Sequence, residues 1–188
     1  MLIYIHGFNS SALSFKAALA RKRMAELRRS EELESPELPH RPREAIALLE
    51  TLIDSRRDEP VALIGSSLGG YYATWLAERH DVWAVLVNPA VRPGELLQSY
   101  LGRQTNLYTS AQYEFTEAHL AEIRALEVER VTPARYLLMV QTADEVLDYR
   151  DAVAKYRGCE QLVIEGGDHG FSDFERHLDT ALRFCGVV

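Results

Sequence analysis

The sequence predicts an α/β fold in which a mostly parallel sheet is covered by helices on both faces. Five short segments are almost continuously apolar, as expected of strands in a parallel sheet that is buried on both sides. They alternate with longer segments whose apolar residues recur at helical spacing, and parallel strands require such crossover connections. With 188 residues, of which 47% are hydrophobic, the chain has the size and apolar content of one compact domain, residues 1–188.

The strands are predicted from runs of β-branched and other large apolar residues. They are residues 2–5, 61–64, 82–87, 135–142 and 160–166. The helices predicted between and after them are residues 12–30, 43–56, 68–79, 147–156 and 172–184. A weaker strand is predicted at 33–38, where Pro36 suits only the edge or the end of a strand because proline has no amide hydrogen to donate.

Residues 89–134 interrupt this alternation. The segment contains Pro89, Pro93 and Gly94, followed by two modest helical patterns at about 94–101 and 116–127. One interpretation is an insertion that packs over one end of the sheet as a lid, because long connections in compact domains are often functional. The other is a plain connection that contains two helices.

Charge and composition argue against several classes of partner. The formal net charge is −7, which opposes binding to nucleic acid or to an anionic membrane surface. No apolar stretch approaches the roughly 20 residues needed to span a bilayer, and the apolar run near Met1 is too short for a signal peptide. We therefore expect a soluble, cytoplasmic protein. Cys159 and Cys185 are interpreted as reduced structural residues, with a single disulfide left open.

The segment Gly65-Ser66-Ser67-Leu68-Gly69 has the pattern G-x-S-x-G. A predicted strand precedes it and a predicted helix follows, which is the setting of a nucleophile elbow with Ser67 at its centre. Glycines at both ends of the motif allow strand and helix to approach closely while the central residue is strained. The alternative is that the two serines only cap the helix.

A nucleophilic serine needs a base, and the base needs an acid that orients it. With an elbow of this kind the acid and the histidine follow the serine in that order, each in a loop after a later strand. The loops after 135–142 and 160–166 contain Asp144 and His169, which predicts a Ser67–His169–Asp144 triad. Glu145 and Asp148 are the alternatives for the acid.

The tetrahedral intermediate needs two amide N–H donors. They are predicted to be those of Leu68, directly after the nucleophile, and of Phe8, in the loop after the first strand. His6 is predicted to brace this loop rather than to act as a second base. The other histidines, namely His40, His80, His119 and His177, are expected on solvated surfaces, and their spacing predicts neither a metal site nor a cofactor.

Taken in order, the segments YIHGFNSS, GSSLGGYYATWLA, NPA, QTADEVLDYR and GGDHGF resemble the YqiA-type small bacterial esterases, relatives of the YcfP proteins in the α/β-hydrolase superfamily. The resemblance implies a compact α/β-hydrolase whose sheet lacks the first antiparallel hairpin of larger members. It also implies Ser67 as nucleophile, Asp144 as acid and His169 as base, with aryl esters and acyl-CoA thioesters as substrates. Ala143 departs from the pattern, since relatives often have glycine there.

These features predict a serine esterase that hydrolyses acyl esters of small molecules through an acyl-enzyme, without a cofactor. One alternative is an acyl-CoA thioesterase with the same triad, in which Arg92 and Arg103 meet the CoA phosphates. Another is a binding protein that has the fold without the activity. Leu96, Leu97 and Tyr100 are predicted to line an apolar acyl pocket, although they could instead be the inner faces of packed helices.

Overall fold

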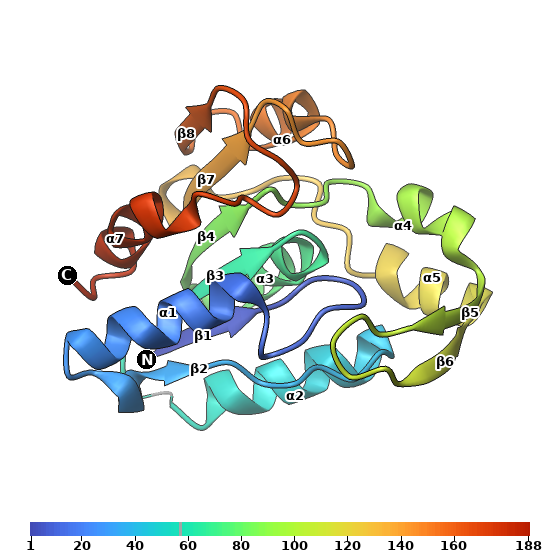
Figure 1. Cartoon of the computed structure of the whole chain (residues 1–188), viewed down its shortest axis with the longest axis horizontal. Helices are drawn as coiled ribbons and strands as arrows, with labels where there is room; N and C mark the ends of the chain where they lie inside the picture. Colours follow the sequence, from blue (N-terminus) through green and yellow to red (C-terminus); the bar gives the residue numbers. More distant parts are fainter. Residues whose placement is uncertain (57) are drawn as a thin grey trace.

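The computed structural model describes residues 1–56 and 58–188. A six-stranded parallel sheet lies at its centre, in the order β2-β1-β3-β4-β7-β8 (Figure 1). Its strands are β1 (Leu2–Ile5), β2 (Leu33–Glu34), β3 (Ala62–Ser66), β4 (Trp83–Val87), β7 (Tyr136–Gln141) and β8 (Glu160–Ile164). The five predicted strands and the parallel sheet are thus confirmed. The weaker strand is the edge strand β2, which ends before Pro36.

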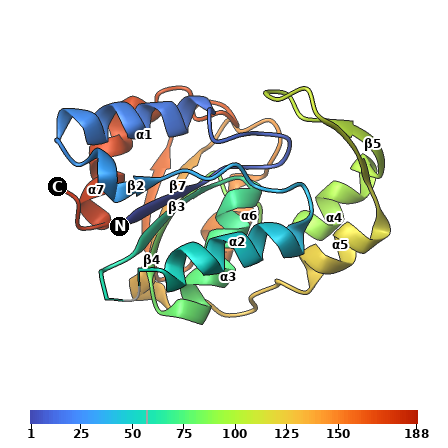
Figure 2. The same ribbon diagram turned by 90° about the horizontal axis from the view of Figure 1, so that it is seen from below.

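Helices cover both faces of this sheet, as predicted. One face carries α1 (Phe15–Glu26) and α7 (Phe174–Phe184). The opposite face carries α2 (Pro42–Asp54), α3 (Leu68–His80) and α6 (Tyr149–Lys155). Figure 2 shows α1 and α7 on one side of the sheet and α2 and α3 on the other.

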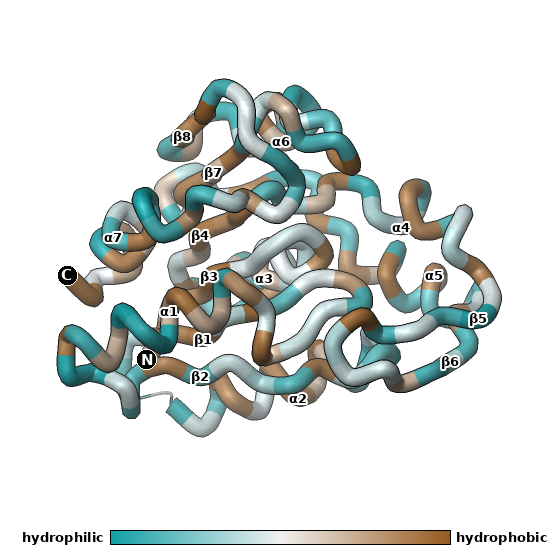
Figure 3. Tube along the Cα trace, in the orientation of Figure 1, coloured by the Kyte–Doolittle hydropathy of each residue, from teal (hydrophilic) through white to brown (hydrophobic). Residues whose placement is uncertain are grey.

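The strands are apolar on both sides because each side faces a separate hydrophobic cluster. In β1, Leu2 and Tyr4 pack towards α1 and α7, whereas Ile3 and Ile5 pack towards α2 and α3. All four side chains are at most 1% exposed. The tube in Figure 3 is accordingly brown along much of the central strands. This two-sided burial explains why their sequences do not alternate between polar and apolar residues.

The segment 89–134 contains helices and a hairpin. Its elements are α4 (Pro93–Leu96), the 3₁₀ helix η2 (Leu97–Tyr100), β5 (Gly102–Thr105), β6 (Gln112–Phe115) and α5 (Glu117–Arg124). Helix α5 agrees with the pattern at 116–127, but the pattern at 94–101 is divided between α4 and η2. The antiparallel hairpin β5–β6 was not predicted, because most of its side chains are at least partly exposed and no apolar run marks it.

Within the described residues, no helix is long and apolar enough to cross a membrane. Cys159 and Cys185 are both free thiols, so the disulfide that the sequence left open is not formed.

Candidate active site

Ser67 lies at a sharp turn between β3 and α3, with φ 55° and ψ −121°. The turn depends on the flanking glycines, because a Cβ at Gly65 would lie 2.3 Å from the Gly69 carbonyl oxygen. A Cβ at Gly69 would lie 2.1 Å from the carbonyl oxygen of Ile5. Ser67 makes no side-chain cap bond to the helix that follows. The structure therefore has the strained elbow geometry and does not support the capping alternative.

The Ser67 hydroxyl faces His169. Ser67 Oγ and His169 Nε2 are 3.1 Å apart, and His169 Nδ1 lies 2.9 Å from Asp144 Oδ2. The three predicted residues, which belong to loops after β3, β7 and β8, thus form one hydrogen-bonded line. The distances are those at which a base can accept the serine proton while a carboxylate fixes the imidazole tautomer.

Asp144 is the carboxylate at the imidazole ring, and its side chain is only 2% exposed. Burial opposes its charge, but hydrogen bonds from His169 and from the Leu147 and Val146 amides outweigh burial and hold the pKa of Asp144 below its ordinary value. The two alternative acids are engaged elsewhere. Glu145 Oε2 accepts the backbone N–H of His169 at 3.0 Å, and Asp148 caps α6 through the Arg150 amide.

The His169 loop is held by two buried side chains that sequence analysis did not single out. Asn88 Nδ2 donates to the carbonyl oxygens of Asp168, at 3.0 Å, and His169, at 3.2 Å. Gln141 Oε1 accepts the backbone N–H of Asp168 at 3.0 Å. The backbone N–H of Gln141 in turn donates to Asn88 Oδ1 at 3.0 Å. Both side chains are at most 2% exposed. Their only sequence signal is a polar residue at the carboxyl end of a buried strand.

Lys16, in α1, is hydrogen-bonded to the same loop. Its Nζ donates to the Gly170 carbonyl oxygen at 2.5 Å. Burial lowers the pKa of Lys16 to about 8, although the carboxylates of Asp168 and Asp144 oppose the shift. The sequence gives no local signal for this contact, which joins residues that are 154 positions apart.

The predicted oxyanion loop passes directly against Ser67. A Cβ at Gly7 would lie 3.1 Å from the Ser67 Cβ atom, which leaves room only for glycine without a local shift. Phe8 and Leu68 line one shared cavity beside this contact. In the described part of the chain, neither backbone N–H has a hydrogen-bond partner. Both predicted donors are therefore free of partners within the protein.

His6 braces the loop, as predicted. Its Nε2 accepts the Leu38 amide at 3.1 Å, so the ring proton lies on Nδ1, which is 3.0 Å from the Gly7 carbonyl oxygen. Burial lowers the pKa of His6, which keeps the ring neutral. The expectation that His119 lies on a solvated surface is wrong. It is 9% exposed, and its Nδ1 accepts the Thr116 amide at the start of α5.

The three residues predicted for the acyl pocket have different surroundings. Leu96 lines a cavity of about 360 Å³ together with Val146 and Leu147. Leu97 is only 4% exposed and packs in the hydrophobic core, which leaves it little surface for a ligand. Tyr100 is 40% exposed and lies edge-on to Phe8, with ring centroids 5.6 Å apart.

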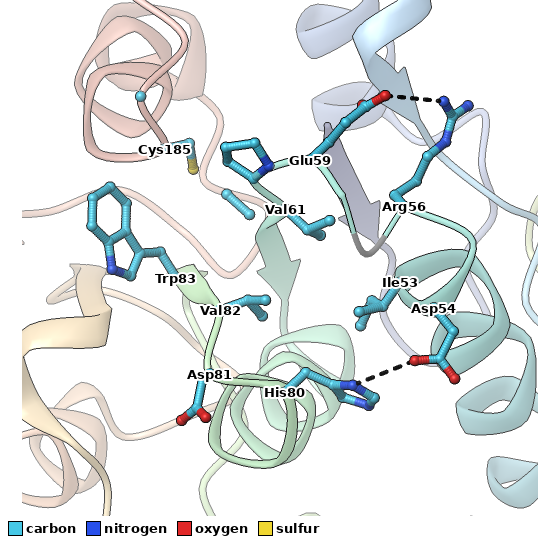
Figure 4. A pocket seen from close by; sticks show the side chains of 13 residues that line it. Ile53, Asp54, Arg56, Glu59, Val61, His80, Asp81, Val82, Trp83 and Cys185 are labelled. Atoms are coloured by element: carbon cyan, nitrogen blue, oxygen red, sulfur yellow. Dashed lines mark ion pairs between the residues drawn. The ribbon is translucent and has the colours of Figure 1, made fainter.

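A larger cavity, of about 710 Å³, lies at the opposite end of the sheet. Figure 4 shows Val61 and Val82 in its wall, close to the amino ends of β3 and β4, and the His80–Asp54 ion pair. Ser67 follows the carboxyl end of β3, so this cavity is remote from the triad. In the described ranges, no cluster of three histidine, cysteine or acidic residues could hold a metal ion.

Solved structures share this fold. Est1E from Butyrivibrio proteoclasticus is 15% identical with a TM-score of 0.75, and the match covers 97% of this chain and 84% of that one. Mouse alpha/beta hydrolase domain-containing protein 10 is 16% identical with a TM-score of 0.68, covering 97% and 89%. The monoacylglycerol lipase of Paleococcus ferrophilus is 14% identical with a TM-score of 0.62, covering 100% and 94%.

At these identities the similarity establishes the α/β-hydrolase fold. The sequence adds a match over residues 1–186 to the model of the uncharacterised protein family UPF0227. The fold and this match together confirm the resemblance to YqiA-type proteins. The chain therefore belongs to family UPF0227, with the architecture of the α/β-hydrolase superfamily.

Proposed function

We propose that this protein is a serine hydrolase that cleaves carboxylic esters of small molecules through an acyl-enzyme. The proposal rests on one observation, the hydrogen-bonded line from Ser67 Oγ through His169 to the buried carboxylate of Asp144. It needs no cofactor, because the three side chains and two backbone amides supply the nucleophile, the base and the oxyanion donors.

In the first half of the reaction Ser67 Oγ attacks the ester carbonyl carbon while its proton moves to His169 Nε2. Asp144 stabilises the imidazolium that forms, and its low pKa keeps it charged for this role. The amides of Phe8 and Leu68 donate to the oxyanion of the tetrahedral intermediate. The intermediate collapses when the bond to the leaving oxygen breaks, and that oxygen takes the proton from His169.

In the second half a water molecule attacks the acyl carbonyl carbon, and His169 Nε2 accepts the water proton. The bond to Ser67 Oγ then breaks, Oγ recovers a proton from His169, and the carboxylic acid leaves. The same two amides stabilise the second oxyanion. Each half-reaction returns the triad to its starting protonation state, so the enzyme turns over without a co-reactant other than water.

The thioester alternative uses the same residues. The sequence suggested Arg92 as a partner of the CoA phosphates. In the structure its Nη2 lies 2.9 Å from Asp151 Oδ2, and its Nε lies 3.6 Å from Glu95 Oε2. These carboxylates compete with a phosphate for Arg92, which favours the oxygen ester as the substrate. Values of kcat/KM for an oxygen ester and a thioester with the same acyl group separate the two functions.

Labelling with a fluorophosphonate probe tests the nucleophile. We expect wild type to be labelled and Ser67→Ala to be unlabelled and inactive. Ser66→Ala is a matched control, because Ser66 is the adjacent serine and is buried at 6% exposure. It should keep most of the labelling. A wild-type protein that resists the probe, or a labelled Ser67→Ala variant, would refute the proposal.

A further inference from the structure

We propose that the acyl group of the substrate occupies the cavity between residues 37–40 and the β5–β6 hairpin, and that this cavity selects neutral, apolar acyl groups of medium length. The cavity has a volume of about 530 Å³. This inference rests on the proposed function, since it assigns a subsite of the same reaction. It moves the acyl pocket away from the position predicted from sequence.

The cavity adjoins the position where the oxyanion forms. Its lining includes Phe8 and Leu68, which supply the two proposed donors, and Gly7, where an added Cβ would lie 3.1 Å from the Ser67 Cβ atom. A carbonyl oxygen held by those amides places the acyl carbon beside this cavity.

The stereochemistry of the intermediate favours this side of Ser67. The leaving oxygen must lie within reach of His169 Nε2 to receive its proton, so the acyl group extends away from His169. In the sheet order, β7 and β8, which precede Asp144 and His169, lie on one side of β3. Strands β1 and β2 lie on the other side of β3 (Figure 1). The segments that follow them form part of the wall of this cavity.

Two other cavities near the triad fit the acyl group less well. The cavity of about 360 Å³ at Leu96 is lined by residues that follow β4 and β7, on the same side as Asp144. The cavity of about 370 Å³ at Lys16 contains Asp168 and Gly170, the two neighbours of His169. Its wall also includes several hydroxyl groups, which suit a polar leaving group or water better than an acyl chain.

The lining indicates what the acyl group is. Leu68 and Tyr72 are 7% and 4% exposed and form an apolar floor, with Phe8 and Leu38 beside it. Glu37 is exposed in the same wall, and its carboxylate opposes an acyl group that ends in a negative charge. The acyl groups that fit are therefore uncharged and apolar next to the carbonyl.

The β5–β6 hairpin fixes one wall of the cavity to the oxyanion loop. Asn106 Nδ2 donates to the Ser10 carbonyl oxygen at 2.7 Å, and the Tyr113 hydroxyl donates to Asn9 Oδ1 at 2.6 Å. The Leu107 amide donates to the Asn9 carbonyl oxygen at 3.2 Å. The segment 89–134 thus contributes to the proposed subsite through the hairpin, which sequence analysis did not expect.

Substitutions that narrow the cavity test the assignment. Leu38→Trp and Ala111→Trp each add bulk to its wall, and Ala111 is an exposed hairpin residue whose replacement leaves the core intact. The quantity measured is the ratio of kcat/KM for an octanoyl ester to that for an acetyl ester of the same alcohol. We expect both variants to lower this ratio at least about tenfold relative to wild type.

Leu96→Trp is the matched control, because it narrows the neighbouring cavity instead. It should leave the ratio close to the wild-type value. The assignment is overturned if Leu96→Trp lowers the ratio, or if both cavity variants leave it unchanged while the acetyl ester is still hydrolysed. If the wild-type protein neither hydrolyses the acetyl ester nor reacts with the fluorophosphonate probe, the proposed function is overturned, and the inference with it.

Discussion

The side-chain amide of Asn88 is hydrogen-bonded to the backbone of His169, with Asn88 Nδ2 3.2 Å from the His169 carbonyl oxygen. Asn88 has φ 41° directly after β4, the strand next to the one that precedes Ser67. The backbone of the proposed base, His169, is therefore held by a buried residue at the end of a central strand as well as by its own loop. These bonds fix the backbone that carries the imidazole facing the Ser67 hydroxyl.

Replacing Asn88 with aspartate should slow the chemical step without weakening substrate binding. Asn88→Asp keeps the size of the side chain but turns its donor into an acceptor that faces two carbonyl oxygens. We expect kcat to fall about tenfold to a hundredfold while KM changes little, because a displaced base weakens the chemical step more than binding. Steady-state kinetics and the rate of fluorophosphonate labelling check this prediction. Both are measured well below the melting temperature of the variant. A raised KM with normal kcat would contradict it.

Two neighbouring acidic residues should differ sharply in their importance. Asp144→Asn removes the charge beside His169 and should lower kcat by about 10³- to 10⁴-fold with the fold intact. Glu145→Gln retains an acceptor for the His169 amide and should lower kcat less than about tenfold. Circular dichroism verifies that both variants are folded. Equal losses in kcat would show that the carboxylate at the ring has been wrongly assigned.

The parts of the site that were predictable are those fixed by local sequence. The Gly65–Gly69 spacing determines the elbow, because each glycine is packed against backbone that a Cβ would overlap. Asp144 and His169 follow from the rule that the acid and the base come after later strands. Ala143 does not have a positive φ, so its departure from the pattern has no backbone consequence.

The parts that escaped prediction depend on contacts between distant segments. Asn88 and Gln141 are hydrogen-bonded to Asp168, which lies 80 and 27 residues further along the chain. A polar residue at the end of a buried strand is their only local signal, and it does not identify the partner. The hairpin was missed because its strands are short, partly exposed and polar. Leu97 resembles a pocket residue in sequence, but only tertiary packing decides that an apolar helix residue is buried in the core.

The lowered pKa of Lys16 predicts a pH-dependent stability. In the unfolded chain Lys16 has an ordinary pKa near 10.5, so between about pH 8 and 10.5 the unfolded state binds more protons than the folded state. The contribution of Lys16 to the free energy of unfolding therefore rises with pH across this window. Below pH 8 the burial of its charge is a constant penalty.

Urea unfolding of wild type and Lys16→Met at several pH values isolates this contribution. We expect the free energy of unfolding of wild type to increase relative to that of Lys16→Met as the pH rises from 8 towards 10.5. Other titrating groups are common to both proteins and cancel in the difference. A flat difference would mean that folding does not shift the pKa of Lys16, and a falling difference would mean that folding raises it.

The strained backbone conformation of Ser67 should lower the free energy of unfolding of the protein. Its φ of 55° with ψ −121° is a backbone conformation that glycine adopts readily and other residues adopt only under strain. We expect Ser67→Gly to be inactive yet more stable than Ser67→Ala, by about 1 kcal/mol in the free energy of unfolding, because alanine keeps the strain and glycine releases it. Urea denaturation of the two variants measures the difference. Since both lack the hydroxyl, the comparison removes the Ser67–His169 hydrogen bond from consideration, and an alanine variant as stable as the glycine variant would show that the elbow is unstrained.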